Sequence, residues 1–250
     1  MLKFACIFVI LFINTSFAKP KIAADHPFII SAISQMSPNK FEYIKVYSKN
    51  AHDGIYLKPN EIRKISSADL TFSISHFESL KQLKLKNKVI NLADCSILKD
   101  EFCSKDKHFW LSSDVACQIY EQILSEISIF LEKNEINQAR KIINGVKNIK
   151  NKENLSCHVL TSHNFGTRLS KIVSIDGYIF HNGSILPKVL ESIQNKPYII
   201  VSDGKFPDEL RQKIHKDSKV VIIDADGMNI DKYETYINNI SQLLTSKCTI

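Results

Sequence analysis

Three histidines and one aspartate of this 250-residue chain lie where predicted strands end or predicted helices begin. His52 is in a loop after a β-branched run, and His108 is in a polar loop ahead of a helical pattern. His163 and Asp224 follow the ends of two later apolar runs. Three imidazoles and one carboxylate form a tetrahedral ligand set for zinc, with bonds of about 2.0 to 2.2 Å. We therefore expect a single zinc site if these four side chains meet.

Spacing gives these residues no local signature, because they are spread from position 52 to position 224 and form no motif such as HExxH. A loop histidine is commonly a surface or hydrogen-bonded residue, and an aspartate after a strand commonly caps a helix or forms a turn. The fourth place is open among Asp224, Asp226 and a water molecule.

The elements that would position these residues follow an alternating pattern. Short β-branched runs alternate with segments of helical period, which is typical of parallel sheets with crossover helices. Strands are expected at 21–24, 43–47, 69–73, 89–91, 158–161, 172–175, 198–201 and 220–223. Helices are expected at 28–36, 59–66, 77–85, 164–169, 186–194, 207–215 and 233–245. Loops at the carboxyl ends of such strands converge on a crevice, where side chains from two lobes can meet.

The middle of the chain has a different pattern. From 113 to 150 no strand is indicated, and apolar residues recur at the helical spacing of Ala116, Ile119, Ile123 and Ile127. The sequence therefore predicts an α/β protein with two lobes, each with a mostly parallel sheet, joined by a helical connector, with the metal site in the cleft between the lobes. The expected boundaries are 19–112 for the N-terminal lobe, 113–150 for the connector and 151–250 for the C-terminal lobe.

The first 18 residues have the features of an export signal. Lys3 precedes an apolar run over 4–13, and Ser16, Phe17 and Ala18 form an ending that suits signal peptidase. No other stretch approaches the roughly 20 apolar residues that a membrane-spanning helix needs. We expect cleavage near Ala18 and a periplasmic location.

The charge balance is basic, with 33 Lys and Arg against 26 Asp and Glu and a formal net charge of +7. The lysines are mostly dispersed among Asn, Ser and Ile, and they do not alternate with aromatic residues. This pattern indicates a solvated basic surface, and we expect no nucleic-acid partner.

Five cysteines follow the predicted signal: Cys95, Cys103, Cys117, Cys157 and Cys248. An oxidising compartment permits disulfides, and the odd number leaves at least one thiol unpaired. Cys95 and Cys103 are the closest pair and bracket a polar loop, but the sequence leaves the connectivity open. No CxxC spacing occurs, so a cysteine zinc site is not expected. Cys117 lies on the apolar face of the helical pattern and is predicted to be a buried thiol.

Four segments around the candidate ligands resemble the signature segments of a known family. They are NAHDGIYLKPNEIRKISSADLTFSISHFESL at 50–80, DKHFWLSS at 106–113, HVLTSHNFGTRLSK at 158–171 and IIDADGMNID at 222–231. Together they resemble the metal-binding solute-binding proteins of ABC importers, the ZnuA-like and TroA-like group, over nearly the whole chain after the signal. The histidine-rich loop of many zinc-uptake members is missing, because residues 80–107 contain no histidine.

The resemblance implies that His52, His108 and His163 are the first three metal ligands and that Asp224 supplies the carboxylate. It implies a binding protein without enzymatic activity that delivers its metal to a membrane permease. We expect this protein to be a monomer. Zinc is expected rather than manganese, because three imidazoles suit zinc and because manganese-specific relatives are expected to carry Glu at the position of His163.

Two other functions are compatible with the same residues. A zinc hydrolase would need an open coordination position for water and a nearby base, for which Asp226 or Asp203 could be considered. An adhesin or interaction protein could keep the fold and the site, since surface recognition leaves no motif.

Overall fold

The computed structural model describes residues 18–47, 57–101, 103, 106–149, 157–163, 165–169, 174–181, 184–204 and 206–248. The predicted signal peptide lies outside these residues apart from Ala18, and His52 also lies outside them. None of the helices in the described ranges is both long and apolar enough to cross a membrane.

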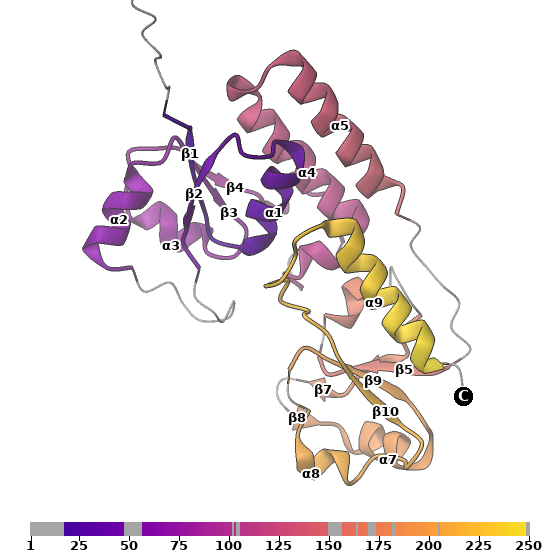
Figure 1. Cartoon of the computed structure of the whole chain (residues 1–250). Coiled ribbons are helices and arrows are strands. Elements are labelled where there is room, and N and C mark those ends of the chain that lie inside the picture. Colours follow the sequence, from indigo (N-terminus) through magenta and orange to yellow (C-terminus); the bar gives the residue numbers. More distant parts are fainter. Residues whose placement is uncertain are drawn as a thin grey trace, which may run out of the picture.

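The N-terminal lobe is built on a four-stranded parallel sheet with the strand order β2-β1-β3-β4 (Figure 1). Its strands are β1 (Lys21–Ala24), β2 (Glu42–Lys45), β3 (Leu70–Ser73) and β4 (Val89–Asn91). Its helices are α1 (Pro27–Met36), α2 (Pro59–Ser66) and α3 (Phe77–Gln82). Proline stands at the first helical position of α1 and α2, where its missing N–H leaves no hydrogen bond unmade.

The two faces of this sheet are covered by different helices. Ala23 of β1 packs in one cluster with Ile65 of α2 and Leu80 of α3. Its neighbour Ile22 packs on the opposite face with Phe28 of α1. Because successive side chains of a strand point to opposite faces, the apolar run of β1 is buried on both sides, as parallel strands between helix layers are.

A helical hairpin follows the N-terminal lobe. It comprises the short 3-10 helix η1 (Phe109–Leu111), α4 (Ser113–Ile127), the 3-10 helix η2 (Ser128–Phe130) and α5 (Lys133–Lys147). Figure 1 shows α4 and α5 side by side and next to α1, and contacts among the three helices agree with this view. The apolar stripe of α4 is buried, including Ile119, Ile123 and Ile127.

The C-terminal lobe has a second four-stranded parallel sheet with the order β10-β9-β5-β6. Its strands are β5 (Val159–Thr161), β6 (Gly177–Tyr178), β9 (Ile199–Ser202) and β10 (Lys219–Ile222), with a small antiparallel hairpin of β7 (Phe180–His181) and β8 (Ser184–Ile185). Its helices are α6 (Gly166–Leu169), α7 (Pro187–Asn195), α8 (Asp208–Arg211) and α9 (Tyr233–Cys248). The predicted α/β class with two parallel sheets is confirmed.

One continuous apolar core joins the two lobes. Phe72 of the first sheet and Val201 of the second belong to the same cluster of buried side chains, which runs through α4 and α9. Leu160 and Ile200 face the other side of the second sheet and pack in a separate cluster with residues of α7 and α8. The lobes are therefore held together by apolar packing in addition to the chain connections between them.

Three predicted elements differ from the structure. Of the strand expected at 172–175, residues 172 and 173 lie outside the described residues and 174–175 are not in a strand; β6 begins at Gly177, next to Asp176, whose carboxylate accepts the N–H of Val159 at 2.6 Å. The helix expected at 77–85 ends at Gln82, and Lys84 adopts a left-handed backbone conformation with φ of 48° that is incompatible with a continuing helix. The helix expected at 207–215 is shorter and covers only α8.

The cysteines of the described ranges form two disulfide bonds, Cys95–Cys103 and Cys157–Cys248. The predicted unpaired thiol is confirmed, because Cys117 is free and buried in α4. The Cys157–Cys248 bond joins the segment before β5 to the end of α9, two positions far apart in the chain whose pairing the cysteine spacing leaves open.

Candidate metal site

His108 lies just before η1, in the loop that leads from the N-terminal lobe into α4. Its side chain is buried, with a residue exposure of 7%. Its Nδ1 lies 2.6 Å from Oδ1 of Asp106, and the same carboxylate oxygen accepts the backbone N–H of His108 at 3.0 Å. A carboxylate can only accept, so Nδ1 carries a proton and the neutral ring has its lone pair on Nε2. That nitrogen lies 3.8 Å from Oδ1 of Asp226.

Opposing effects act on the pKa of His108. Burial lowers it, but hydrogen bonding and charge from Asp106 and Asp226 together outweigh burial and raise the pKa to about 9. The surroundings of His108 therefore favour a positive charge at this place.

His163 follows β5 in the C-terminal lobe, and Asp203 follows the neighbouring strand β9. Nε2 of His163 lies 2.5 Å from Oδ2 of Asp203, while Oδ1 of Asp203 accepts a hydrogen bond from the hydroxyl of Ser162 at 3.1 Å. Burial would raise the pKa of Asp203, but the hydrogen bond and charge of His163 outweigh it and lower the pKa to about 2. The lone pair of the neutral His163 ring is then on Nδ1.

The two histidines come together across the boundary between the lobes. Their ring centroids are 5.7 Å apart, and the ring of Phe165 lies 5.9 Å from His108 and 4.8 Å from His163. Each ring is oriented by a carboxylate on one nitrogen, which is the arrangement that fixes the tautomer of metal-binding histidines.

The turn after β10 brings two aspartates to the same region. Both carboxylate oxygens of Asp224 accept backbone N–H groups of this turn, from Met228 at 3.0 Å and from Asn229 at 2.7 Å. Asp226 instead turns toward His108. Asp224 thus shapes the turn, and Asp226 is the carboxylate that approaches Nε2 of His108.

Trp110 holds this turn against the loop of His108. Its Nε1 donates a hydrogen bond of 2.6 Å to the backbone oxygen of Ala225. Gly227 has φ of 65°, and a Cβ at this position would lie 2.8 Å from Nε1 of Trp110. Glycine is required here both by the left-handed backbone and by the close approach of the indole ring.

His26 is a buried neighbour of the site that the sequence did not single out. It follows β1, stacks on Trp110 with ring centroids 4.0 Å apart, and accepts the N–H of Phe28 on Nδ1 at 3.2 Å. Burial lowers the pKa of His26 to about 3, against the opposing effect of Asp226. The sequence signal that could have identified His26 is its place just after a strand; Asp203, considered from the sequence only as a base, carries the same signal because it follows β9.

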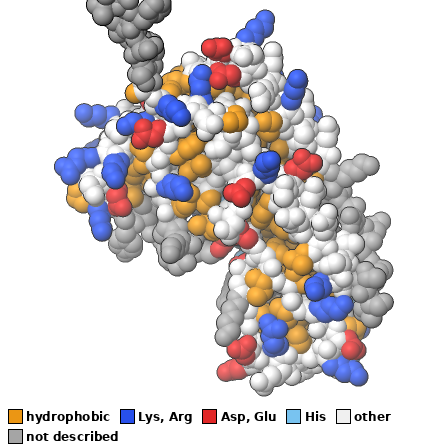
Figure 2. Space-filling view, in the orientation of Figure 1, with side chains coloured by type: hydrophobic (Ala, Val, Ile, Leu, Met, Phe, Trp, Pro, Cys, Tyr) orange, Lys and Arg blue, Asp and Glu red, His pale blue; other side chains and the backbone are white. Residues whose placement is uncertain are grey.

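Negative charge prevails around the two histidines. Asp106, Asp203, Asp224 and Asp226 all lie in the segments just described, and Arg168, which faces Asp106, also pairs with Asp100. Acidic side chains are visible at the waist between the lobes in Figure 2, while Lys and Arg side chains are scattered over the face shown. Such a region attracts cations.

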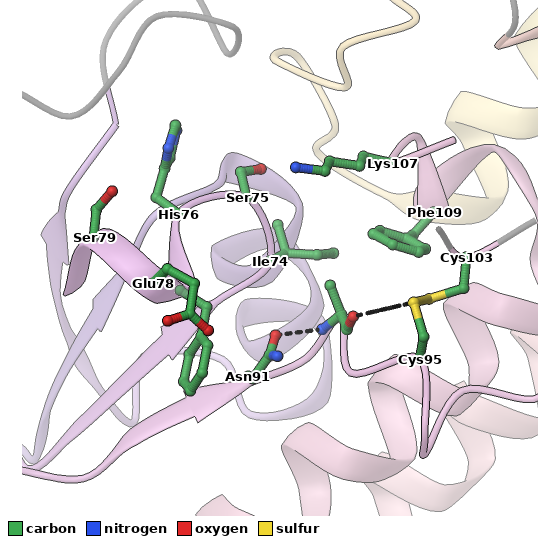
Figure 3. A pocket seen from close by; sticks show the side chains of 12 residues that line it. Ile74, Ser75, His76, Glu78, Ser79, Asn91, Cys95, Cys103, Lys107 and Phe109 are labelled. Carbon is green, nitrogen blue, oxygen red and sulfur yellow. Dashed lines mark hydrogen bonds between the residues drawn. A yellow bond between two sulfur atoms is a disulfide. The ribbon is translucent and has the colours of Figure 1, made fainter. Parts of the chain in front are cut away.

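A pocket of about 340 Å³ opens beside this region, at the carboxyl ends of β3 and β4. Figure 3 shows Lys107 reaching toward Ser75 across the pocket, with Phe109 on the wall nearest to the His108 loop. His76, Glu78 and Asn91 contribute the remaining larger polar side chains of its lining, so the pocket has a mixed polar and apolar wall.

Of the four predicted ligands, the structure brings His108 and His163 together and places Asp224 in the adjoining turn; His52 lies outside the described residues. Within the described ranges, no three His, Cys, Asp or Glu side chains are arranged to hold one metal ion.

Comparison with solved structures shows that this chain has the fold of the TroA-like metal-binding solute-binding proteins. In this fold, two α/β lobes with parallel sheets share a helical core. The periplasmic zinc-binding protein TroA of Treponema pallidum matches with a TM-score of 0.68 and 11% identity, covering 93% of this chain and 100% of TroA. The SBP FpvC of Pseudomonas aeruginosa in complex with Mn²⁺ matches with a TM-score of 0.67 and 13% identity, covering 92% of this chain and 98% of FpvC. The predicted resemblance is confirmed at the level of the fold.

Sequence comparison gives a more limited result. The uncharacterized protein RP014 of Rickettsia prowazekii (strain Madrid E) is 25% identical over 267 residues, covering 95% of this chain and 88% of that protein. No protein-family model matches the sequence.

Proposed function

We propose that this chain is the metal-binding component of an ABC importer, exported to the periplasm, where it captures zinc as a monomer and delivers it to a membrane permease. The observation that carries the proposal is the meeting of His108 and His163, one from each lobe, with ring centroids 5.7 Å apart. The names of the structural neighbours, a zinc-binding protein and an SBP with bound Mn²⁺, support metal as the cargo.

The proposed ligands are His52, His108, His163 and a carboxylate of the turn at 224–226. The approach of Asp226 to Nε2 of His108 at 3.8 Å supports Asp226 as the fourth ligand. The two backbone hydrogen bonds that Asp224 accepts support a role for Asp224 in holding the turn. Zinc is favoured over manganese because three of the four donors are imidazoles.

Elemental analysis of the purified chain, followed by zinc titration calorimetry, tests the proposal. We expect one zinc per chain, a strong loss of affinity in His52→Ala, His108→Ala and His163→Ala, and wild-type binding in the control His158→Ala, whose side chain is exposed. Asp226→Asn is expected to weaken binding more than Asp224→Asn does once both variants are shown to be folded.

The alternatives give different results in the same experiments. A chain that carries no metal and whose melting temperature does not respond to zinc would contradict the transport proposal and favour an interaction protein. Turnover of ester or peptide substrates that is lost with the histidines would favour a zinc hydrolase instead.

A further inference from the structure

Arg168 is an unusual feature of the interior. It lies on α6, five residues after His163, and it is the largest of the side chains that are fully buried in the described part of the chain, with an exposure of 1%. A guanidinium keeps its charge in proteins, so its burial requires charged or strongly polar partners.

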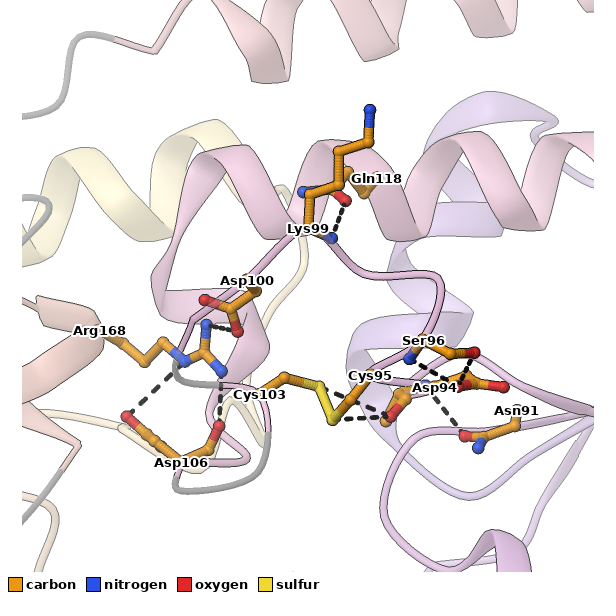
Figure 4. The surroundings of a disulfide bond; sticks show 11 residues. Asn91, Asp94, Cys95, Ser96, Lys99, Asp100, Cys103, Asp106, Gln118 and Arg168 are labelled. Carbon is orange, nitrogen blue, oxygen red and sulfur yellow. Dashed lines mark hydrogen bonds and ion pairs between the residues drawn. A yellow bond between two sulfur atoms is a disulfide. The ribbon is translucent and has the colours of Figure 1, made fainter.

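These partners come from the other lobe, in the segment that leads to His108 (Figure 4). Arg168 forms an ion pair with the carboxylate of Asp100, and its Nη2 donates a hydrogen bond of 2.6 Å to the backbone oxygen of Asp106. Its Nε lies 3.7 Å from Oδ2 of Asp106, and its guanidinium carbon lies 4.9 Å from the ring centroid of Phe109.

The same Asp106 carboxylate orients His108. Its Oδ1 accepts both the backbone N–H and the Nδ1–H of His108, while its Oδ2 faces Arg168. Arg168 and His108 therefore hold Asp106 from opposite sides. Without Arg168, the buried carboxylates of Asp100 and Asp106 would lose the cation between them, and burial of such unpaired charges is costly enough to displace the segment.

The disulfide Cys95–Cys103 limits the freedom of this segment on its other side. Asp100 lies within the eight-residue separation that the bond closes, so its carboxylate is carried on a short covalent ring (Figure 4). Arg168 thus contacts one point of a loop that is already restrained, Asp100, and a second point just beyond that loop, Asp106.

We propose that Arg168 is a positioning residue for the metal site: through Asp106 it fixes the Nδ1–H of His108 in place, so that Nε2 is presented to a cation shared with the C-terminal lobe. The inference rests on the proposed metal-binding function. Because Arg168 and His163 belong to the same β5–α6 segment, the contact also sets the distance between the two histidines.

Zinc titration of the full chain and of Arg168→Met and Arg168→Lys tests the role, with Arg211→Met as a matched control on the exposed surface of α8. Removal of outer partners of metal-binding histidines lowers metal affinity roughly 10- to 100-fold. We expect a loss in this range for Arg168→Met, a smaller loss for Arg168→Lys, which keeps the charge but lacks the fork, and no loss for Arg211→Met.

A proton NMR readout on ¹⁵N-histidine-labelled protein separates positioning from general stability. The Nδ1–H of His108, assigned by its absence in His108→Ala, should be slow to exchange in the wild type and in Arg211→Met. It should exchange rapidly or disappear in folded Arg168→Met. If that variant does not fold, Arg168→Lys must show both effects.

Wild-type zinc affinity together with an unchanged Nδ1–H signal in the folded Arg168 variants would overturn the inference. A wild-type chain that binds no zinc would instead overturn the proposed function. In that case the Nδ1–H signal, which requires no metal, still decides whether Arg168 positions His108.

Discussion

Substitution of Gly227 by alanine examines how the turn at 224–229 is held next to the candidate site. The glycine has φ of 65°, and an added Cβ would lie 2.8 Å from Nε1 of Trp110 and 2.9 Å from Cδ1 of Ile230. Neither neighbour is free to move, because the Trp110 indole is hydrogen-bonded to Ala225 and both side chains are buried.

The magnitude follows from two costs. A non-glycine residue in the left-handed conformation costs about 1 kcal/mol, and the insertion of a methyl group into a packed site costs about 1 to 3 kcal/mol. If Trp110 shifts to relieve the overlap, its buried N–H loses its acceptor at a similar cost of about 1 to 3 kcal/mol. We therefore expect Gly227→Ala to lower the free energy of unfolding by about 2 to 4 kcal/mol.

The assay is thermal and urea unfolding followed by circular dichroism, with Gly145→Ala as the control. Gly145 lies on the exposed side of α5, where an added Cβ meets nothing within 4 Å. Alanine should stabilise this helix by about 0.5 to 1 kcal/mol. At about 2 to 4 °C per kcal/mol for a chain of this size, Gly227→Ala should melt roughly 5 to 15 °C below the wild type. A Gly227→Ala variant that melts at or above the wild-type temperature would refute the reasoning.

Three further outcomes follow from the structure. His26 is buried as a neutral ring with its pKa lowered to about 3, so the free energy of unfolding should decrease as the pH falls from the unfolded pKa of 6.5 toward 3. In urea titrations, His26→Asn, which keeps a helix-capping side chain, should reduce this pH dependence by about one proton. The pKa of His108 is raised to about 9, so zinc must displace a proton from this ring when it binds. Calorimetry at pH 7.5 in buffers of different ionisation enthalpy should show the release of about one proton, and equal binding heats in all buffers would contradict this. The Cys157–Cys248 bond spans 91 positions and the Cys95–Cys103 bond spans 8. Loop closure therefore predicts that replacing the first pair by serine lowers the free energy of unfolding by about 4.6 kcal/mol and replacing the second by about 2.5 kcal/mol; the reverse order in unfolding experiments would show that loop closure does not govern their contribution.

The amino-acid sequence by itself determined the elements and their class. Alternating apolar runs and helical stripes predicted seven of the eight expected strands close to their observed places, because a strand buried between helix layers must be apolar along its length. Proline at position 59 marked the start of α2 for a local reason, its tolerance at the first helical position. The candidate histidines could be selected because the carboxyl ends of parallel strands meet in one region, whatever the details of packing.

Tertiary structure alone decided which side chains face one another there. In the sequence, Arg168 has no feature that distinguishes it from other helix residues; only the fold places it between Asp100 and Asp106. Asp203 is the partner of His163 because β9 pairs with β5. Asp224 and Asp226 have the same chemistry and lie two positions apart in the chain. The Asp224 carboxylate accepts backbone N–H groups of its own turn, whereas Asp226 faces His108. Local pattern reports the preference of a segment for helix or strand, whereas burial, ion pairing and hydrogen bonding depend on groups that are distant in sequence and adjacent only in the folded chain.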